Sequence, residues 1–240
     1  MKLLSTKICV SIAANKPEDI RRQIGRAFHF GADFVEIRFD FLEQHNMGET
    51  IKIVEAIKER AIFTLRSAQE NGKFRGSDED RISWLKEFSL HRPMLVDVEL
   101  RTLLQNDQLA DFFSGNKTRI LVSWHDFQKT PTNKVLTDTV RQMKMYSTYL
   151  KVVTTTKYVQ DCIRLLDLYD VTSELNLIAF GMGELGVLSR ILCTICGNAP
   201  FTYSSLEDPI APGQLTLQQM RRLFDKVDFK LGKGNERNLF

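Results

Sequence analysis

One lysine, Lys151, stands inside a short apolar run, Tyr149-Leu150-Lys151-Val152-Val153. A short apolar run with polar flanks predicts a buried strand of a parallel sheet. Burial disfavours the ammonium and favours the neutral amine, which attacks a ketone to form an imine that then withdraws electrons. The alternative is a structural lysine near a strand end whose ammonium reaches water. The run alone leaves both interpretations open, so other residues must decide between them.

A histidine, His125, ends another apolar strand in the segment Ser123-Trp124-His125-Asp126. An imidazole changes its charge near neutral pH, so it can accept and donate a proton in one reaction. The alternative is a structural histidine that caps the following loop. Its position at a strand end, beside a lysine able to form an imine, favours the catalytic interpretation.

Charged and polar residues also end or follow most of the other predicted strands. Alternate residues of a strand point to one face, so Glu36, Arg38 and Asp40 should share a face if Val35 and Ile37 face the helices. A structural ion-pair network is the alternative interpretation for two of the acidic candidates, Asp97 and Glu99. The remaining candidates are Arg66, Ser67, Glu70, Ser123, Glu184, Ser189, Arg190 and Gln214.

Strand and helix patterns alternate along the whole chain, in eight pairs. This repeat predicts an α/β fold, a single-domain (β/α)8 TIM barrel whose active site lies at the carboxyl ends of the strands. A doubly wound open sheet is the alternative, but no G-x-G-x-x-G follows the first strand. Strands are predicted over residues 7–12, 34–39, 61–65, 94–99, 119–124, 149–153, 176–180 and 201–203. Helices are predicted over residues 17–30, 49–60, 78–90, 102–113, 133–147, 159–169, 185–194 and 217–224.

The domain bounds, the ends of the chain and one long loop have their own predictions. Residues 1–231 are expected to form the catalytic barrel domain, and residues 232–240 a polar, loose C-terminal tail. Because Lys7 begins the first strand almost at once, an amino-terminal hairpin across the barrel floor is expected to be short or absent. Residues 204–214 are too long and too rich in proline and glycine for a simple connector, so they are expected to form a lid.

Composition excludes several classes of protein. The 240 residues carry a net charge of +3 without a basic block, so a small anion is a better ligand than nucleic acid. No stretch approaches the roughly 20 apolar residues of a membrane span, and a cytoplasmic location is expected. Cys193 and Cys196 form a lone CxxC without a second Cys/His pair, so no metal is expected and the four cysteines are interpreted as buried thiols.

Several motifs, in register over nearly the whole chain, resemble those of type I 3-dehydroquinate dehydratases. Each motif alone is weak, whereas the ordered set is specific. Lys151 falls at the position of the imine lysine. The motifs are residues 32–40 (ADFVEIRFD), 63–67 (FTLRS), 123–127 (SWHDF) with Thr130-Pro131, 182–186 (MGELG) with Ser189-Arg190, and 211–214 (APGQ).

This resemblance implies a reaction: the syn loss of water from 3-dehydroquinate to give 3-dehydroshikimate, in the shikimate pathway, without a cofactor or a metal. By the same resemblance Lys151 forms the imine, His125 moves the protons and Glu70 orients the histidine. A homodimer is also expected. The residues implied to bind the substrate or order its pocket are Glu36, Arg38, Arg66, Arg190 and Gln214.

One position departs from the family pattern, and two other functions stay open. Many family members have a serine just before the Ala-Pro-Gly-Gln element, where this chain has Ile210, so one lid hydrogen bond is in doubt unless Ser204 or Ser205 replaces it. A Schiff-base aldolase on the same barrel would share Lys151 but would not need His125 and Arg190 together. A sugar-acid binding protein would need no imine lysine.

Overall fold

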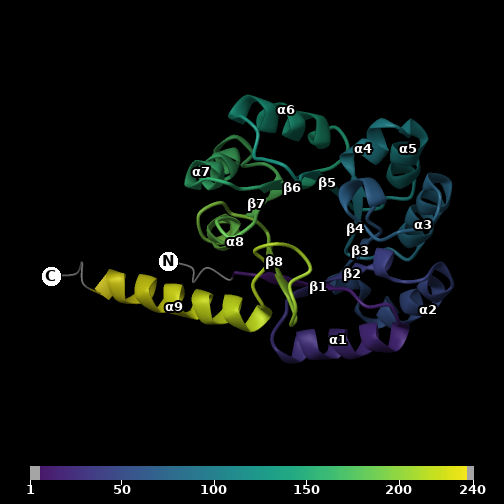
Figure 1. Cartoon of the computed structure of the whole chain (residues 1–240), viewed down its shortest axis with the longest axis horizontal. Helices are drawn as coiled ribbons and strands as arrows, with labels where there is room; N and C mark the ends of the chain where they lie inside the picture. The colour runs from purple at the N-terminus through teal and green to yellow at the C-terminus, as the bar shows by residue number, and fades with distance from the viewer. Residues whose placement is uncertain (1–5, 237–240) are drawn as a thin grey trace.

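Eight parallel strands form a nearly closed barrel in the computed structural model, which describes the backbone of residues 6–236 and the side chains of residues 6–227. The strands pair in the order β7-β6-β5-β4-β3-β2-β1-β8, and within the described residues β7 and β8 share no backbone ladder. Helices surround the strands (Figure 1), so the predicted (β/α)8 barrel is confirmed. The strands are β1 (Ile8–Ile12), β2 (Phe34–Arg38), β3 (Ala61–Thr64), β4 (Leu95–Glu99), β5 (Ile120–Asp126), β6 (Tyr149–Thr155), β7 (Asn176–Met182) and β8 (Thr202–Ser205).

The helices are amphipathic and cover the outer face of the strands. In α1 the buried residues Pro17, Ile20, Ile24 and Ala27 recur at three- and four-residue spacing, which places them on one face of the helix. The helices are α1 (Pro17–His29), α2 (Gln44–Val54), α3 (Asp78–Leu90), α4 (Leu100–Leu104), α5 (Asp107–Gly115), α6 (Asn133–Lys144), α7 (Val159–Asp167), α8 (Gly186–Ile195) and α9 (Leu217–Glu236). Short 3₁₀ turns lie at Phe39–Phe41, Glu55–Arg60, Ala68–Glu70 and Leu168–Val171.

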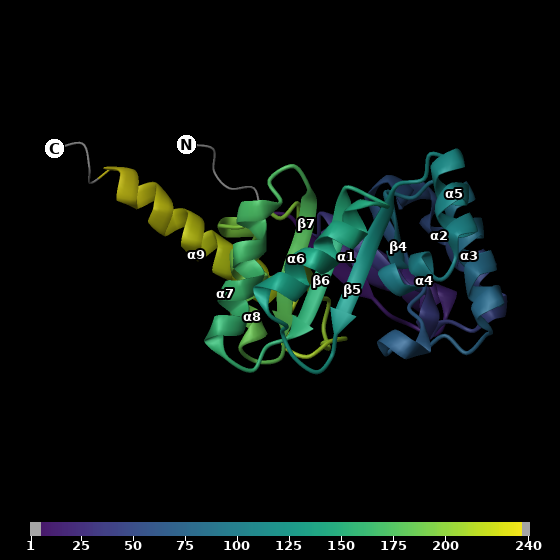
Figure 2. The same ribbon diagram turned by 90° about the horizontal axis from the view of Figure 1, so that it is seen from above.

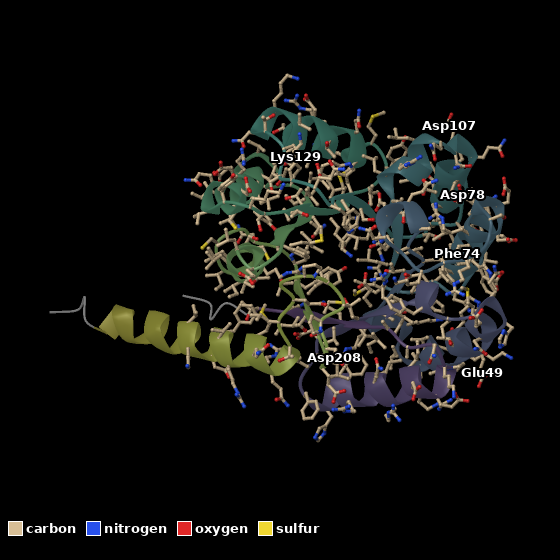
Figure 3. All side chains as sticks on the ribbon, viewed as in Figure 1. Glu49, Phe74, Asp78, Asp107, Lys129 and Asp208 are labelled. Carbon is tan, nitrogen blue, oxygen red and sulfur yellow. The ribbon has the colours of Figure 1, made fainter. Side chains whose placement is uncertain are left out.

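Alternate strand residues belong to two separate apolar clusters. Val35 and Ile37 of β2 belong to the larger cluster between strands and helices, where side chains fill the space in Figure 3. The smaller cluster is formed by the opposite residues of the strands, among them Ile62 and Tyr203, and lies inside the barrel. Glu36, between Val35 and Ile37, lines the interior cavity together with Arg38. The predicted inward face of this strand is therefore confirmed for these two residues.

Asp40 does not share that face, because β2 ends at Arg38 and the chain turns into the 3₁₀ segment Phe39–Phe41. The helix predicted over residues 102–113 is also interrupted. The structure has α4 and α5 instead, with Asn106 between them at φ −145° and ψ 78°. The Asn106 amide donates to the carbonyl oxygen of Thr102 at 3.0 Å, a local bond that competes with helix continuation.

The structure describes the backbone of the C-terminal helix but not the first five residues. Helix α9 continues to Glu236 and extends away from the barrel in Figures 1 and 2, so the tail expected to be loose from Gly232 is helical up to that residue. The domain boundary after residue 231 stays a prediction. The expected short or absent amino-terminal hairpin concerns residues 1–5, which lie outside the described residues. Between residues 6 and 236, no helix has the length and apolar character needed to cross a membrane.

Candidate active site

A cavity of about 500 Å³ lies at the carboxyl ends of the strands. Its walls come from strands β1, β2, β5, β6, β7 and β8, from helix α8 and from the loops after β3, β7 and β8. All the residues predicted for catalysis or substrate binding line it, although their roles stay predictions. They are Glu36, Arg38, Arg66, Glu70, His125, Lys151, Arg190 and Gln214.

Lys151 lies on β6 and its ammonium faces two carboxylates. Its Nζ is 3.2 Å from Oε1 of Glu36 and 3.2 Å from Oδ2 of Asp97, and the residue is 6% exposed. The adjacent residues Leu150 and Val152 belong to the apolar cluster between strands and helices, so they do not surround the nitrogen. At the nitrogen, the two carboxylates offset the cost of burying a charge and hold the side chain in a defined place.

Asp97 and Arg66 form the centre of a buried ion network. Both Asp97 oxygens accept from Nη2 of Arg66 at 2.9 Å, and Ser123 Oγ donates to Asp97 at 2.7 Å. Burial works in the opposite direction, but the charges of Arg66 and Lys151 hold the pKa of Asp97 well below its usual value. Asp97 is therefore part of a structural ion-pair network, as one of the two interpretations expected, and it also contacts Lys151. Glu99 fits the structural interpretation, since it accepts from the backbone N–H of Ser67 at 2.7 Å.

The second carboxylate at Lys151, Glu36, has its own hydrogen bonds. Its Oε2 accepts from Ser11 Oγ at 2.7 Å, and its Oε1 accepts from Thr64 Oγ1 at 3.0 Å. Burial alone would raise the pKa of Glu36, yet the charges of Lys151 and Arg38 outweigh it and lower the pKa. Glu36 therefore stays ionised, and three donors, Ser11, Thr64 and Lys151, hold its carboxylate in place.

His125 and Glu70 form a pair in the wall of the cavity. His125 Nδ1 lies 2.8 Å from Glu70 Oε2, and the imidazole stacks on Phe127 with ring centroids 5.6 Å apart. Burial, with the charges of Arg66 and Lys151, lowers the pKa of His125 well below its usual value, so the imidazole is neutral at neutral pH. With Nδ1 donating to the carboxylate, Nε2 is the nitrogen able to accept a proton. Burial raises the pKa of Glu70, although Arg66 opposes the shift.

Arg190 is a buried cation that lacks an anionic partner among the described residues. It comes from α8, is 2% exposed, and its guanidinium lies over the ring of Phe180 at 4.1 Å. Its Nε has no hydrogen-bond partner within the described part of the chain. Burial lowers the pKa of Arg190 to about 10. Burying a cation of this kind is costly unless an anion pairs with it, so an anionic ligand in the cavity would stabilise Arg190.

Arg38 is paired within its own segment. Its Nε and Nη2 donate to the two oxygens of Asp40 at 2.8 Å, and Asp40 also accepts from the backbone N–H of Lys73 at 3.0 Å. Asp40 therefore fastens the loop after β3 to the end of β2. Arg38 and Lys73 both line the cavity, so two basic side chains lie in its wall.

Gln214 lies in the loop after β8, and its side chain already accepts hydrogen bonds within that loop. Its Oε1 accepts from the backbone N–H groups of Ile210, at 2.9 Å, and Ala211, at 3.3 Å. The loop also contacts the β7–α8 connection, where the N–H of Gly183 donates to the carbonyl oxygen of Pro212 at 3.1 Å. The amide nitrogen of Gln214 is thus the group left to meet a ligand.

The hydroxyls considered as replacements at Ile210 are not in the cavity. Ser204 and Ser205 belong to β8 and are fully buried, and neither is among the residues that line the cavity within the described chain. Ile210 itself lines the cavity with an apolar side chain.

Sequence reasoning missed the aromatic and apolar part of the wall. Phe180 of β7 and Tyr203 of β8 line the cavity together with the charged groups. Strand alternation could have found Tyr203 as an inward residue, because it stands two positions after Phe201 and both belong to the inner apolar cluster. The cysteine interpretation was wrong for one residue, since Cys196 is exposed, whereas Cys9, Cys162 and Cys193 are buried.

The chain matches the family model described as type I 3-dehydroquinase over residues 8–228. The 3-dehydroquinate dehydratase of Dehalococcoides mccartyi is 34% identical over 226 residues, which cover 92% of this chain and 96% of that protein. The crystal structure of the 3-dehydroquinate dehydratase from Aquifex aeolicus has a TM-score of 0.77 at 27% identity, covering 92% of this chain and 98% of that one. The Geobacillus kaustophilus enzyme, with a TM-score of 0.85 at 22% identity over 94% of this chain and 92% of that one, shares the fold. This chain therefore belongs to the type I 3-dehydroquinase family.

Proposed function

We propose that this protein dehydrates 3-dehydroquinate to 3-dehydroshikimate, in the shikimate pathway, through an imine on Lys151. The observation that carries the proposal is the assembly of Lys151, His125 and Arg190 around one cavity. An amine, a neutral imidazole and a buried guanidinium match the ketone, the acidic C–H bond and the carboxylate of this substrate. Family membership supports the same reaction.

The first step joins Lys151 to the ring ketone. The ammonium gives one proton to the ketone oxygen, and the freed amine nitrogen bonds to the carbonyl carbon. A second proton then passes from the nitrogen to the same oxygen, which leaves as water. The product is an iminium with one N–H and one positive charge, so atoms and charge balance. Its charge draws electrons from the neighbouring carbon and makes a proton there more acidic.

His125 then moves one proton. Its neutral Nε2 takes the proton from the carbon beside the imine, and the electron pair passes into the C=C–N unit of an enamine. The hydroxyl on the next carbon leaves as water with the proton that His125 had taken, while the electrons return to form the conjugated iminium. Water hydrolyses this iminium, which releases the product and restores Lys151.

Arg190 is proposed to bind the substrate carboxylate, because its guanidinium is buried and lacks an anion among residues 6–227. Glu36, Arg38 and Arg66 are proposed to bind ring hydroxyls or to order the pocket, and Gln214 to contact substrate through its amide nitrogen. The separate contacts give the substrate one orientation, with its ketone toward Lys151.

A turnover assay tests the proposal. Purified protein is mixed with 3-dehydroquinate, and the absorbance of the conjugated enone product is followed over time. We expect turnover by the wild type and none by Lys151→Ala, with circular dichroism confirming that the variant is folded. An unchanged absorbance with folded wild-type protein would leave an aldolase or a sugar-acid binding protein as the better interpretation.

We also propose that the protein is a homodimer. The neighbouring helices α7 and α8 and the residues before them carry exposed apolar side chains, namely Tyr158, Val159, Ile163 and Leu188, with exposed fractions from 47% to 67%. A second copy would cover such a face. Sedimentation at several concentrations should show a dimer that Leu188→Glu weakens. A monomer at high concentration would contradict the proposal.

A cytoplasmic location is proposed on the free thiols, because Cys9, Cys162, Cys193 and Cys196 are all unbridged. Reduced thiols are typical of that compartment. Fractionation of cells that express the protein would test it, and recovery mainly outside the cytoplasm would contradict it.

A further inference from the structure

Tyr203 is an aromatic residue of the cavity that the proposed reaction has not used. It lies on β8, is 3% exposed and lines the same cavity as Lys151. Its ring packs against Phe180, with centroids 6.0 Å apart, and against Phe201, with centroids 5.6 Å apart. These contacts on two sides hold the ring in one orientation.

The ring of Tyr203 faces the reactive nitrogen. Lys151 Nζ lies 4.2 Å from the ring centroid, well within the distance at which an aromatic face attracts a cation. The same nitrogen is 3.2 Å from Glu36 and 3.2 Å from Asp97. Two carboxylates and one aromatic face therefore surround it, and the cavity lies on its remaining side.

These contacts change unequally when an imine forms. The ammonium has three N–H donors and can serve both carboxylates, whereas an iminium has one N–H and can serve only one of them. The attraction to an aromatic face depends on positive charge and needs no N–H. The ring contact is therefore the one that can continue unchanged from the ammonium to the iminium.

We propose that Tyr203 is a positioning residue, whose ring holds the Lys151 nitrogen and stabilises the positive charge of the iminium. This inference rests on the proposed imine on Lys151. It assigns to a residue of β8 a part in the reaction that neither the charged groups nor His125 supply. The ring also limits where the nitrogen can move, because it forms the part of the cavity wall that faces the Lys151 nitrogen.

The hydroxyl of Tyr203 has no part in the proposed role, which belongs to the ring. It is buried and has no hydrogen-bond partner within the described part of the chain. Burial raises the pKa of Tyr203 well above its usual value, so the phenol stays neutral. Removing an unsatisfied buried hydroxyl costs no hydrogen bond, and Tyr203→Phe should therefore keep both the fold and the positioning role.

The matched variants are Tyr203→Phe, Tyr203→Leu and Phe201→Leu. Phe201 is 3% exposed, lies beside Tyr203 in the same apolar cluster and does not line the cavity, so its variant measures the loss of an aromatic ring from this layer. For each protein we would measure kcat, KM and the rate at which borohydride traps the 3-dehydroquinate adduct. Tyr203→Leu should lower kcat and trapping by about 5- to 30-fold with a smaller change in KM, whereas Tyr203→Phe, which keeps the ring over the nitrogen, and Phe201→Leu, which keeps the ring of Tyr203, should each lose less than Tyr203→Leu.

A series of fluorinated phenylalanines at position 203 separates charge attraction from packing. Fluorine withdraws electrons from the ring face while the shape is nearly kept, so kcat should fall stepwise with each added fluorine. This series also decides the matter if Tyr203→Leu does not fold.

Equal activity across the fluorinated series would overturn the inference, as would equal losses in Tyr203→Leu and Phe201→Leu. A loss in Tyr203→Phe as large as in Tyr203→Leu would also overturn it, because the hydroxyl would then be the active group. If the wild type itself forms no trapped adduct on Lys151, the proposed imine fails and this inference fails with it. That result is distinct from normal trapping that is insensitive to position 203.

Discussion

His125 Nδ1 lies 2.8 Å from Glu70 Oε2, across 55 residues of sequence, and this contact determines which imidazole nitrogen can act as the base. Glu70→Gln keeps a similar shape but loses the charge that fixes the tautomer. Its kcat should therefore lie between that of the wild type and that of His125→Ala, for which a loss of roughly 10²- to 10⁴-fold is expected. Steady-state kinetics of the two variants, with Glu70→Ala as a third, would check this order. Wild-type kcat in Glu70→Gln and Glu70→Ala would show that the carboxylate has no orienting role.

The protonation of His125 is a separate prediction. Because burial and two nearby cations lower its pKa, the imidazole should still be neutral at pH 6.5 in the folded protein. The unfolded chain binds a proton there near pH 6.5 and the folded chain does not, so the free energy of unfolding should fall as the pH falls through this value. NMR titration would test the state directly, with the signal assigned by its absence in His125→Gln. A midpoint at or above 6.5 would be the opposite result.

Arg190 should act through the substrate carboxylate. A charge-assisted pair contributes about 1.5–3 kcal/mol, so Arg190→Ala should lower kcat/KM by roughly 10- to 150-fold. Arg190→Lys keeps the charge without the planar fork and should lose less. The control is an analogue of the substrate without its carboxylate, against which wild type and Arg190→Ala should perform alike. An equal loss with both compounds would mean that the guanidinium has another partner.

The loop over residues 206–214 should depend on Gly213. This residue has φ +73°, and a Cβ there would lie 2.1 Å from the carbonyl oxygen of Gly183. Gly213→Ala should therefore displace the loop from the β7–α8 connection, lower kcat/KM and speed amide exchange in the loop. Gly48→Ala is the matched control, because a Cβ at Gly48 meets no atom within 4 Å. Wild-type exchange in Gly213→Ala, or unchanged exchange after borohydride trapping in the wild type, would argue against a lid.

Much of the barrel could be predicted because its strands and helices follow from patterns within short stretches of sequence. Strand alternation identified Glu36 and Arg38 as inward residues, and the end of β5 located His125 at the cavity that Lys151 also lines. Local rules also explain an error. The prediction extended the inward face to Asp40, but the chain leaves the strand after Arg38, and a pattern of alternate residues does not indicate where a strand stops.

Contacts across the barrel could not be predicted in the same way. The stagger between strands determines which side chains meet, and a period-two pattern gives only the face to which each points. Lys151 was therefore expected among apolar neighbours, whereas its nitrogen lies between Glu36 and Asp97 and over Tyr203. The same limit applies to Gln214, whose Oε1 accepts hydrogen bonds from its own loop.

The central claim is that Lys151 carries the substrate as an imine. Borohydride is added to the wild-type protein with 3-dehydroquinate, and the peptides are then analysed by mass spectrometry. The expected result is loss of activity together with a reduced adduct on the peptide that contains Lys151, and no adduct when substrate is omitted. An adduct on a different lysine, or full activity and no adduct after reduction in the presence of substrate, would contradict the mechanism.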